Sequence, residues 1–484
     1  MRSPSLPRLP FPMATPEIDY ADVQGTILRG YRVDLARHFV LRVTDAAAAG
    51  AFIGALVDGT GGVPRITTAR RWHTKPECFV NISFTAPGLA ALGVTQAQLQ
   101  SFDPAFVAGA TSDAVASVVG DTGGSAPANW LGGIDTWQNA HVVLSLWVHE
   151  DPEVLERVSA RLRAAFAAGM SELLSHDATA LPDNHVHFGY RDNIAQPTVQ
   201  GAPPRKHAIP DDQPVVPTGE FLLGYPNASG GTYSVQPAQL STNSSYAAFR
   251  ILEQDVVGFE AFLQEFAPQA GVSPEMLAAK ACGRWRNGNP LELMPDDPGT
   301  CLPADQLNDF TYVNTADPAS DDTLGLRCPI GSHIRRTNPR NMAVTGTDST
   351  HHRITRRAMP YGPAYDPAHP TDVPRGLIGY FINASIFNQF QFIQGQWALS
   401  STFVKSAKAP GGQPPGNAVN NISGEDVFLG VNDPSASSFT LPAEPKNAMV
   451  TGFSRMIDTR GSAYVFFPSI TGLRYLASLP ASAS

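Results

Sequence analysis

The feature that most constrains the fold is a strand-and-helix pattern found on both sides of a proline-rich break. The break covers residues 196–217 and contains six prolines, one glycine and few apolar residues. Such a stretch interrupts regular structure and marks a linker or a wrapping segment. We therefore predict a flexible arm at residues 1–18, a domain at 19–200, a linker at 201–217 and a second domain at 218–484.

The first half alternates between strand and helix. Apolar and β-branched runs predict strands at residues 37–43, 78–84 and 141–148. Thr44 and Asp45 offer a cap to an alanine-rich helix that ends near residue 56, and residues 86–92 predict a short helix. Asp151 and Pro152 are start signals for an amphipathic helix that we predict over residues 153–174.

The second half repeats this alternation. Strands are predicted at residues 245–252 and 376–383, with a hairpin formed by 456–459 and 464–467. Helices are predicted at 255–266, 274–282, 385–397 and 471–476, and an exposed irregular loop at 292–324. Two halves of this kind predict an α+β chain in which helices pack on one face of an antiparallel sheet. They suggest duplication, although no residue-level repeat supports it.

Composition excludes some classes of protein. A chain of 484 residues with 43% hydrophobic and 16% charged residues has the composition of a globular protein of two to four domains. Its 34 basic and 43 acidic residues give a net charge of −9, and no basic stripe is present, so nucleic acid is not an expected partner. We interpret the short clusters Arg335-Arg336 and Arg353 with Arg356-Arg357 as local counter-ions.

The cysteines and the amino terminus bear on metal sites and location. The four cysteines are scattered without CxxC spacing, which disfavours zinc sites and a disulfide framework. No apolar run suited to a signal peptide occurs in the first 18 residues, and no run is long enough to span a membrane. We expect a cytoplasmic protein, or a secreted one if a leader was removed before numbering began. The sequence leaves open whether the chain forms a homo-oligomer.

Residues 328–340 carry the most informative pattern, Cys-Pro-Ile-Gly-Ser-His-Ile-Arg-Arg-Thr-Asn-Pro-Arg. His333 lies among small and apolar neighbours and precedes a cationic run. An imidazole beside fixed cations suits haem, whose iron takes a histidine ligand and whose propionates need counter-charges. The alternative is an ordinary core histidine. His185 and His187 would share one face of a strand, but nothing nearby completes a metal site.

Three segments resemble the dye-decolorizing peroxidases. Residues 189–197, Gly-Tyr-Arg-Asp-Asn-Ile-Ala-Gln-Pro, are similar to the GxxDG motif of that family. Residues 328–340 resemble its proximal-histidine segment, and residues 353–362 its distal-arginine segment. The similarity extends along most of the chain. The last glycine of the GxxDG motif is Asn193 here, and asparagine is a residue that tolerates positive φ.

The resemblance implies a fold, a cofactor and site residues. It implies two ferredoxin-like domains, each a four-stranded antiparallel sheet with peripheral helices, and one haem b per chain. His333 would be the iron ligand, and Arg340 the partner of a propionate. The other expected haem contacts are Asn193, Ile194, Ala195, Asn338, Pro339 and Arg356. Family sequences place an aspartate near the position of Ser385 to hold the proximal histidine, and the sequence has none there.

Peroxide chemistry calls for the residues that the motifs provide. Peroxide must lose a proton from one oxygen and gain one on the other, which needs a proton carrier and a cation on one side of the iron. Asp192 is the candidate carrier, because a carboxylate of ordinary pKa can work at acidic pH. Arg356 is the candidate cation, with Arg353 and Arg357 as rivals.

We therefore predict a haem peroxidase that reduces hydrogen peroxide and oxidises dyes, phenolics or similar bulky reductants by one-electron steps. One alternative is a haem carrier or porphyrin-handling protein, although a carrier needs neither Asp192 nor Arg356. Another is a non-haem binding module. Bulky reductants call for a surface relay of electrons, for which Trp397 and Tyr380 are candidates; core packing is the favoured role for both.

Overall fold

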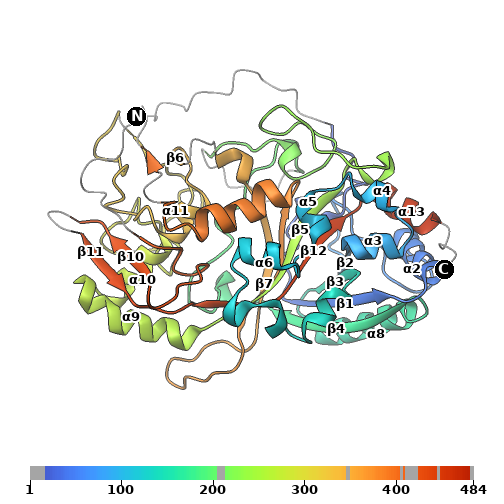
Figure 1. Ribbon diagram of the computed structural model, residues 1–484, viewed down its shortest axis with the longest axis horizontal. Helices are drawn as coiled ribbons and strands as arrows, with labels where there is room; N and C mark the ends of the chain where they lie inside the picture. The colour runs from blue at the N-terminus through green and yellow to red at the C-terminus, as the bar shows by residue number, and fades with distance from the viewer. Residues whose placement is uncertain are drawn as a thin grey trace.

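A computed structural model describes residues 17–203, 213–314, 316–344, 349–403, 407–408, 423–443 and 447–479. All but the last two residues of the predicted arm, and the middle of the predicted linker, lie outside the described residues. The central element of the fold is one antiparallel sheet of eight strands in the order β4-β1-β3-β2-β12-β5-β8-β7. Figure 1 shows its strands running through the middle of the molecule.

The first half of the sheet is built by the amino-terminal part of the chain. Strands and helices alternate as β1, α2, β2, β3, α8 and β4, and the strand order is β4-β1-β3-β2. Their bounds are β1 (Leu35–Val43), α2 (Ala46–Asp58), β2 (Cys78–Phe84), β3 (Val142–Val148), α8 (Pro152–Phe166) and β4 (Met170–Thr179). Every residue of β3 is buried, in keeping with a sequence that is apolar except for Ser145.

The second half repeats the first. Its principal elements are β5 (Ser245–Gln254), α9 (Val256–Ala270), β7 (Thr355–Tyr361), β8 (Gly376–Asn383), η7 (Ile386–Ala398) and β12 (Ile457–Phe467). The order β12-β5-β8-β7 places the fourth, first, third and second strands side by side, as in the first half. Each half thus has ferredoxin-like topology, and the duplication that the sequence only suggested is present in the connectivity.

The two halves join and then approach each other again. Phe466 of β12 pairs with Phe84 of β2, which makes the sheet continuous. The edge strands β4 and β7 also meet, because the rings of His176 and Tyr361 lie 4.6 Å apart. The sheet therefore curves round on itself.

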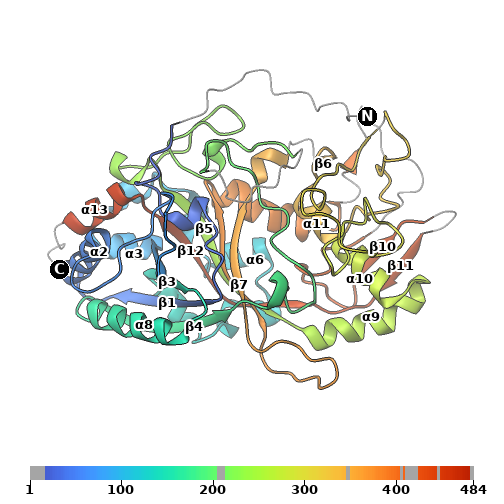
Figure 2. The same cartoon turned by 180° about the vertical axis from the view of Figure 1, so that it is seen from behind.

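Helices cover the two ends of the molecule. Helices α2 and α8 lie with α3 (Ala86–Ala91) and α13 (Ile470–Ser478) at one end of the molecule (Figures 1 and 2). Helix α9 lies at the opposite end with α10 (Pro274–Cys282). The remaining elements are α1 (Gly25–Leu28), α4 (Gln96–Leu99), α5 (Pro104–Ala108), α6 (Asp113–Val119), η1 (Gly123–Ser125), η2 (Pro127–Asn129), α7 (Ile134–Gln138), η3 (Pro182–Asn184), η4 (Thr218–Glu220), η5 (Ala238–Leu240), α11 (His333–Thr337), β6 (Ala343–Val344), η6 (Ser349–His352), β9 (Ala407–Lys408), β10 (Ser438–Leu441) and β11 (Ala448–Thr451).

Most predicted caps are present. The side chain of Asp45 accepts a hydrogen bond from the amide of Ala48, and Asp151 caps α8 in the same way. Ser385 accepts from the amide of Asn388 at the start of η7, although this helix has π geometry rather than the predicted α geometry. Helix α3 ends at Ala91, and Gly93, which follows its C-cap Leu92, has a φ of +101°.

Three predicted elements were wrong in extent or form. The helix predicted over residues 153–174 ends at Phe166, because the carbonyl of Gly169 accepts from the amides of Thr44 and Asp45 and turns the chain into β4. The predicted hairpin is the single strand β12, with a register shift between Thr459 and Gly461. The loop over residues 292–324 is irregular as expected, but it buries Tyr312 completely.

Candidate haem site

His333 is the first residue of α11, and a carboxylate fixes its ring. Its Nδ1 lies 3.0 Å from Oδ2 of Asp426, a residue with no exposed surface. Burial alone would raise the pKa of Asp426, but the nearby His333 and Arg336 and the backbone amide of Leu429 bring it below the ordinary value. The carboxylate is therefore ionised and accepts the proton of Nδ1. This leaves the lone pair of Nε2 directed away from Asp426.

The other oxygen of Asp426 is also engaged. Its Oδ1 accepts hydrogen bonds from the amides of Phe428 and Leu429, at 2.8 and 3.0 Å. The ring of Phe428 lies edge-on to His333, with centroids 5.6 Å apart. Asp426 is thus held in one orientation by the backbone, and it holds His333 in turn.

The two arginines after the histidine do not serve as counter-ions in the cavity, and this expectation was wrong. Arg335 is completely buried and donates to Asp322 and to the carbonyl of Cys328. Arg336, also completely buried, donates to the carbonyls of Gly331, Trp397, Ser400 and Gly424. Burial lowers the pKa of Arg336 to about 10, so it stays charged at neutral pH. Both arginines anchor the helix that carries His333.

Asp192 and Arg356 lie together although they come from different halves of the chain. Nη2 of Arg356 is 3.5 Å from Oδ1 of Asp192, and both side chains are partly exposed. Gln196 ties this loop to β7: its Oε1 accepts from the amide of Arg356, and its Nε2 donates to the carbonyl of Arg356. Asn193 has a φ of +62°, the left-handed conformation that the family glycine would adopt freely.

His333, Asp192 and Arg356 line one cavity of about 470 Å³. Of the predicted contacts, Asn193, Ile194, Ala195, Asn338 and Arg340 also line it, whereas Pro339 is not among the described residues that do. Apolar side chains also line the cavity, among them Ile334, Phe390, Ile393, Phe428 and Leu429. A cavity lined by apolar side chains, by a histidine with a free Nε2 lone pair and by arginines fits a haem.

The two arginines nearest to Asn338 already have protein partners. Arg340 donates to Oδ1 of Asn308 and to the carbonyl of Phe310, with its guanidinium 3.7 Å from the centre of the Phe310 ring. Arg353 contacts Oδ1 of Asn338 at 3.4 Å. Both line the cavity and hold charge at its border.

The two candidate electron relays are core residues. Trp397 and Tyr380 are each 1% exposed, and neither is among the described residues that line the cavity. The hydroxyl of Tyr380 lies 2.6 Å from Oγ of Ser145, which in turn contacts His38. The packing role that the sequence favoured agrees with this burial.

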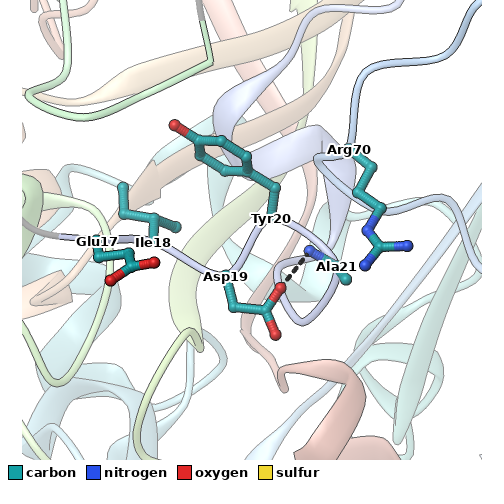
Figure 3. A pocket seen from close by; sticks show the side chains of 6 residues that line it. All are labelled: Glu17, Ile18, Asp19, Tyr20, Ala21 and Arg70. Atoms are coloured by element: carbon teal, nitrogen blue, oxygen red, sulfur yellow. Dashed lines mark hydrogen bonds between the residues drawn. The ribbon is translucent and has the colours of Figure 1, made fainter.

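A second hollow, of about 490 Å³, lies at the start of the described chain (Figure 3). The amide of Ala21 donates to Oδ1 of Asp19 there, as the dashed line shows. The hollow contains none of the predicted haem residues. Its lining consists of Glu17, Ile18, Asp19, Tyr20, Ala21 and Arg70.

Comparison with known proteins identifies the family. No family model matches the chain. A dye-decolorizing peroxidase of Mycena epipterygia is 30% identical over 98% of this chain and 91% of its own length. The chain belongs to the dye-decolorizing peroxidase family. A dye-decolorizing peroxidase of Exidia glandulosa is likewise 30% identical, over 95% of this chain and 87% of its own. A dye-decolorizing peroxidase structure in complex with 2,6-dimethoxyphenol superposes with a TM-score of 0.78 at 27% identity, covering 96% of this chain and all of that one.

Membership makes the chain a haem peroxidase, and the fold is the predicted α+β architecture. The residue that sequence reasoning missed is Asp426. The expected aspartate near Ser385 is absent, and Ser385 instead caps η7 and donates to Asp103. Asp426 lies 93 residues after His333, in a segment that no local pattern marks. No helix among the described residues has the length and apolar character needed to cross a membrane.

Proposed function

We propose that His333 holds the iron of one haem b per chain, and that Asp192 and Arg356 act on hydrogen peroxide. The observation that carries this proposal is that all three side chains line a single cavity. When bound, haem supplies the redox-active iron that takes the oxidising equivalents of peroxide and passes them to reductants. The protein residues bind, orient and move protons around it.

Asp192 is the proton carrier in this proposal. Its Oδ1 faces Arg356, so Oδ2 is the atom that takes a proton from one peroxide oxygen and returns it to the other. Arg356 is the cation that stabilises negative charge on the departing oxygen. Gln196 accepts from the backbone amide of Arg356 and donates to its carbonyl, which fixes this geometry.

At His333, Asp426 keeps the ring proton on Nδ1. The Nε2 lone pair is then available as an iron ligand, and the buried negative charge raises its basicity. We propose further that Arg340 pairs with a propionate and that Asn338 and Pro339 form the turn that presents it. Asn193, Ile194 and Ala195 would contact the porphyrin, because they follow Asp192 directly.

The reducing substrates proposed are dyes, phenolics and similar bulky molecules. We also propose the domain division given above, with residues 201–217 as the linker, since the two four-stranded units fall on either side of it. The cytoplasmic location stays a prediction.

The test is an absorption spectrum of haem-supplemented protein before and after one equivalent of peroxide. Wild type should show a Soret band that is lost or strongly altered in His333→Ala. Its spectral response to peroxide should be about 10²- to 10⁴-fold slower in Asp192→Asn. Asp183→Asn is the matched control, because Asp183 lies in the same segment and does not line the cavity among the described residues.

Two outcomes would contradict the proposal. Haem binding without any response to peroxide in wild type would favour the haem carrier. An unchanged Soret band in His333→Ala would remove that residue as the ligand.

A further inference from the structure

The segment that carries Asp192 is fastened to β7 at two points. Near the start of the strand, Gln196 binds the backbone amide and the carbonyl of Arg356. At the end of the strand, Nε2 of His187 lies 2.7 Å from the carbonyl oxygen of Tyr361. Arg356 and Tyr361 are five positions apart, which is about 17 Å along a β-strand. Asp192 lies in the sequence between the two side chains that bind β7.

Both points are needed, because the segment is longer than the distance it covers. Nine peptide units join His187 to Gln196, and a chain of that length can reach about 30 Å. With one end released, the slack would let the carboxylate of Asp192 move relative to Arg356, whose Nη2 is 3.5 Å from Oδ1. The separation of these two groups therefore depends on both fastenings.

Other contacts of the segment lead to a different part of the molecule. The hydroxyl of Tyr190 donates to the carbonyl of Ala278 in α10 at 2.8 Å. The amide of Arg191 donates to the carbonyl of Arg286 at 2.9 Å. These bonds place the segment relative to α10 and the chain that follows it, whereas Arg356 belongs to β7. The bond from His187 to β7 therefore adds a constraint that they do not supply.

His187 is suited to a fixed hydrogen bond. Its side chain is buried, and because a carbonyl can only accept, Nε2 carries the ring proton. Burial lowers the pKa of His187, the bond to the Tyr361 carbonyl opposes this, and the charge of Arg375 lowers the pKa further. The imidazole is therefore neutral at neutral pH and donates through a single nitrogen.

The second ring nitrogen of His187 limits what the residue contributes to stability. Nδ1 is buried and has no hydrogen-bond partner among the residues that the structure describes. A buried polar atom without a partner costs free energy, which offsets the gain from the bond at Nε2. The bond to Tyr361 thus contributes a fixed position more than it contributes stability.

We propose that His187 is a positioning residue, which holds the carboxylate of Asp192 at its working distance from Arg356 by fastening the segment to β7. The proposal rests on the proposed function, because it concerns the step that Asp192 and Arg356 carry out. His187 is not among the described residues that line the cavity, so it acts through Asp192 and does not touch peroxide.

The test is a double-mutant cycle on the rate at which the spectrum of the haem-loaded enzyme responds to peroxide. His187→Phe keeps an aromatic ring and removes the donor. We expect this change to slow the response about 10-fold, because a small displacement of a reacting group is costly in rate. In the Asp192→Asn background the same change should alter the rate less than about 2-fold, since residues that act through one another are not additive. His187→Gln keeps an N–H donor and should restore most of the rate.

The matched control is His176→Phe. His176 also lies against Tyr361, with ring centroids 4.6 Å apart, but it belongs to β4 and is not among the described residues that line the cavity. Its substitution should leave the response to peroxide unchanged. If His187→Phe does not fold, His187→Met takes its place in the cycle, because methionine also lacks a donor and adapts to irregular buried space.

Amide hydrogen exchange of the apoprotein gives a readout that needs neither haem nor turnover. The amide of Asp192 donates to the carbonyl of Asn184 within the segment. Exchange over residues 184–196 should be faster in His187→Phe than in His176→Phe, because the released segment opens more often.

The outcomes separate this proposal from the proposed function. A slow response in Asp192→Asn together with a wild-type response in His187→Phe overturns the positioning role and leaves the proposed function intact. Equal slowing by His187→Phe in both backgrounds, or equal exchange in the two histidine variants, also overturns the positioning role.

Discussion

Asp426→Asn is expected to weaken haem binding by reversing the tautomer of His333. Oδ1 of Asp426 accepts from two backbone amides, at Phe428 and Leu429. An asparagine must keep its carbonyl oxygen on those donors and so presents its NH₂ group to Nδ1 of His333. The ring would then accept at Nδ1 and carry its proton on Nε2, which removes the lone pair needed by iron.

The size of the effect follows from the role of the carboxylate. Loss of a hydrogen-bond partner behind a metal ligand typically costs about 10- to 100-fold in affinity, or about 1.4 to 2.8 kcal/mol. The pKa of Asp426 is lowered in the folded protein, despite burial, by His333 and its other partners. Its contribution to stability is therefore complete above the unfolded carboxyl pKa of about 3.9, and is lost as pH falls through the lower folded value.

The assay is a haem titration of the apoprotein followed at the Soret band, with urea unfolding of the apoprotein alongside. Asp103→Asn is the matched control, since Oδ1 of Asp103 also accepts from two backbone amides while Oδ2 accepts from Ser385. The control should lose stability but keep its haem affinity. Equal affinities for Asp426→Asn and wild type would refute the tautomer argument, whatever happens to stability.

Two other substitutions test local conformation and charge. Asn193→Ala should lower the free energy of unfolding in urea by about 1 kcal/mol, because φ at this position is +62°. Asn193→Gly should stay within about 0.5 kcal/mol of wild type. Equal losses of stability in the two variants would contradict this. Burial, and then the Asp322 carboxylate, raises the pKa of Glu292 to about 9. The free energy of unfolding must then fall as pH rises from about 4.3, the unfolded pKa, toward that value. We therefore expect the Tm of Glu292→Gln to decline less than that of wild type between about pH 5 and about pH 9. Parallel plots of Tm against pH for the two proteins would refute this reasoning.

The sequence predicted the elements of the fold better than their ends. Strands such as Val142–Val148 are apolar runs whose pattern depends on the strand itself. The end of α8 depends instead on Gly169, whose carbonyl is drawn to amides at Thr44 and Asp45, far away in the chain. The apolar periodicity of the sequence continues past residue 166, because the amides that turn the chain there lie far from α8 in the sequence.

In the candidate site too, residues in recognisable local motifs could be predicted, whereas contacts made by distant parts of the chain could not. That His333, Asp192 and Arg356 line one cavity could be predicted, because each lies in a segment with a recognisable order of residues. Asp426 could not, since its role arises only when the chain brings it under α11. The cationic run at Arg335 and Arg336 was misinterpreted for a similar reason. The sequence shows that a residue is charged, but packing decides where its side chain points.

The closure of the duplicated sheet explains how Asp192 reaches Arg356. Strands β4 and β7 are the two edges of the sheet, and the segment after β4 crosses to β7 where those edges meet. An edge strand leaves unpaired amides and carbonyls, and Gln196 satisfies both groups of Arg356 with its side chain. The side chain that covers the edge thus sets the distance of Asp192 from the arginine, so the pairing of Asp192, our proposed proton carrier, with Arg356 follows from the need to close the sheet.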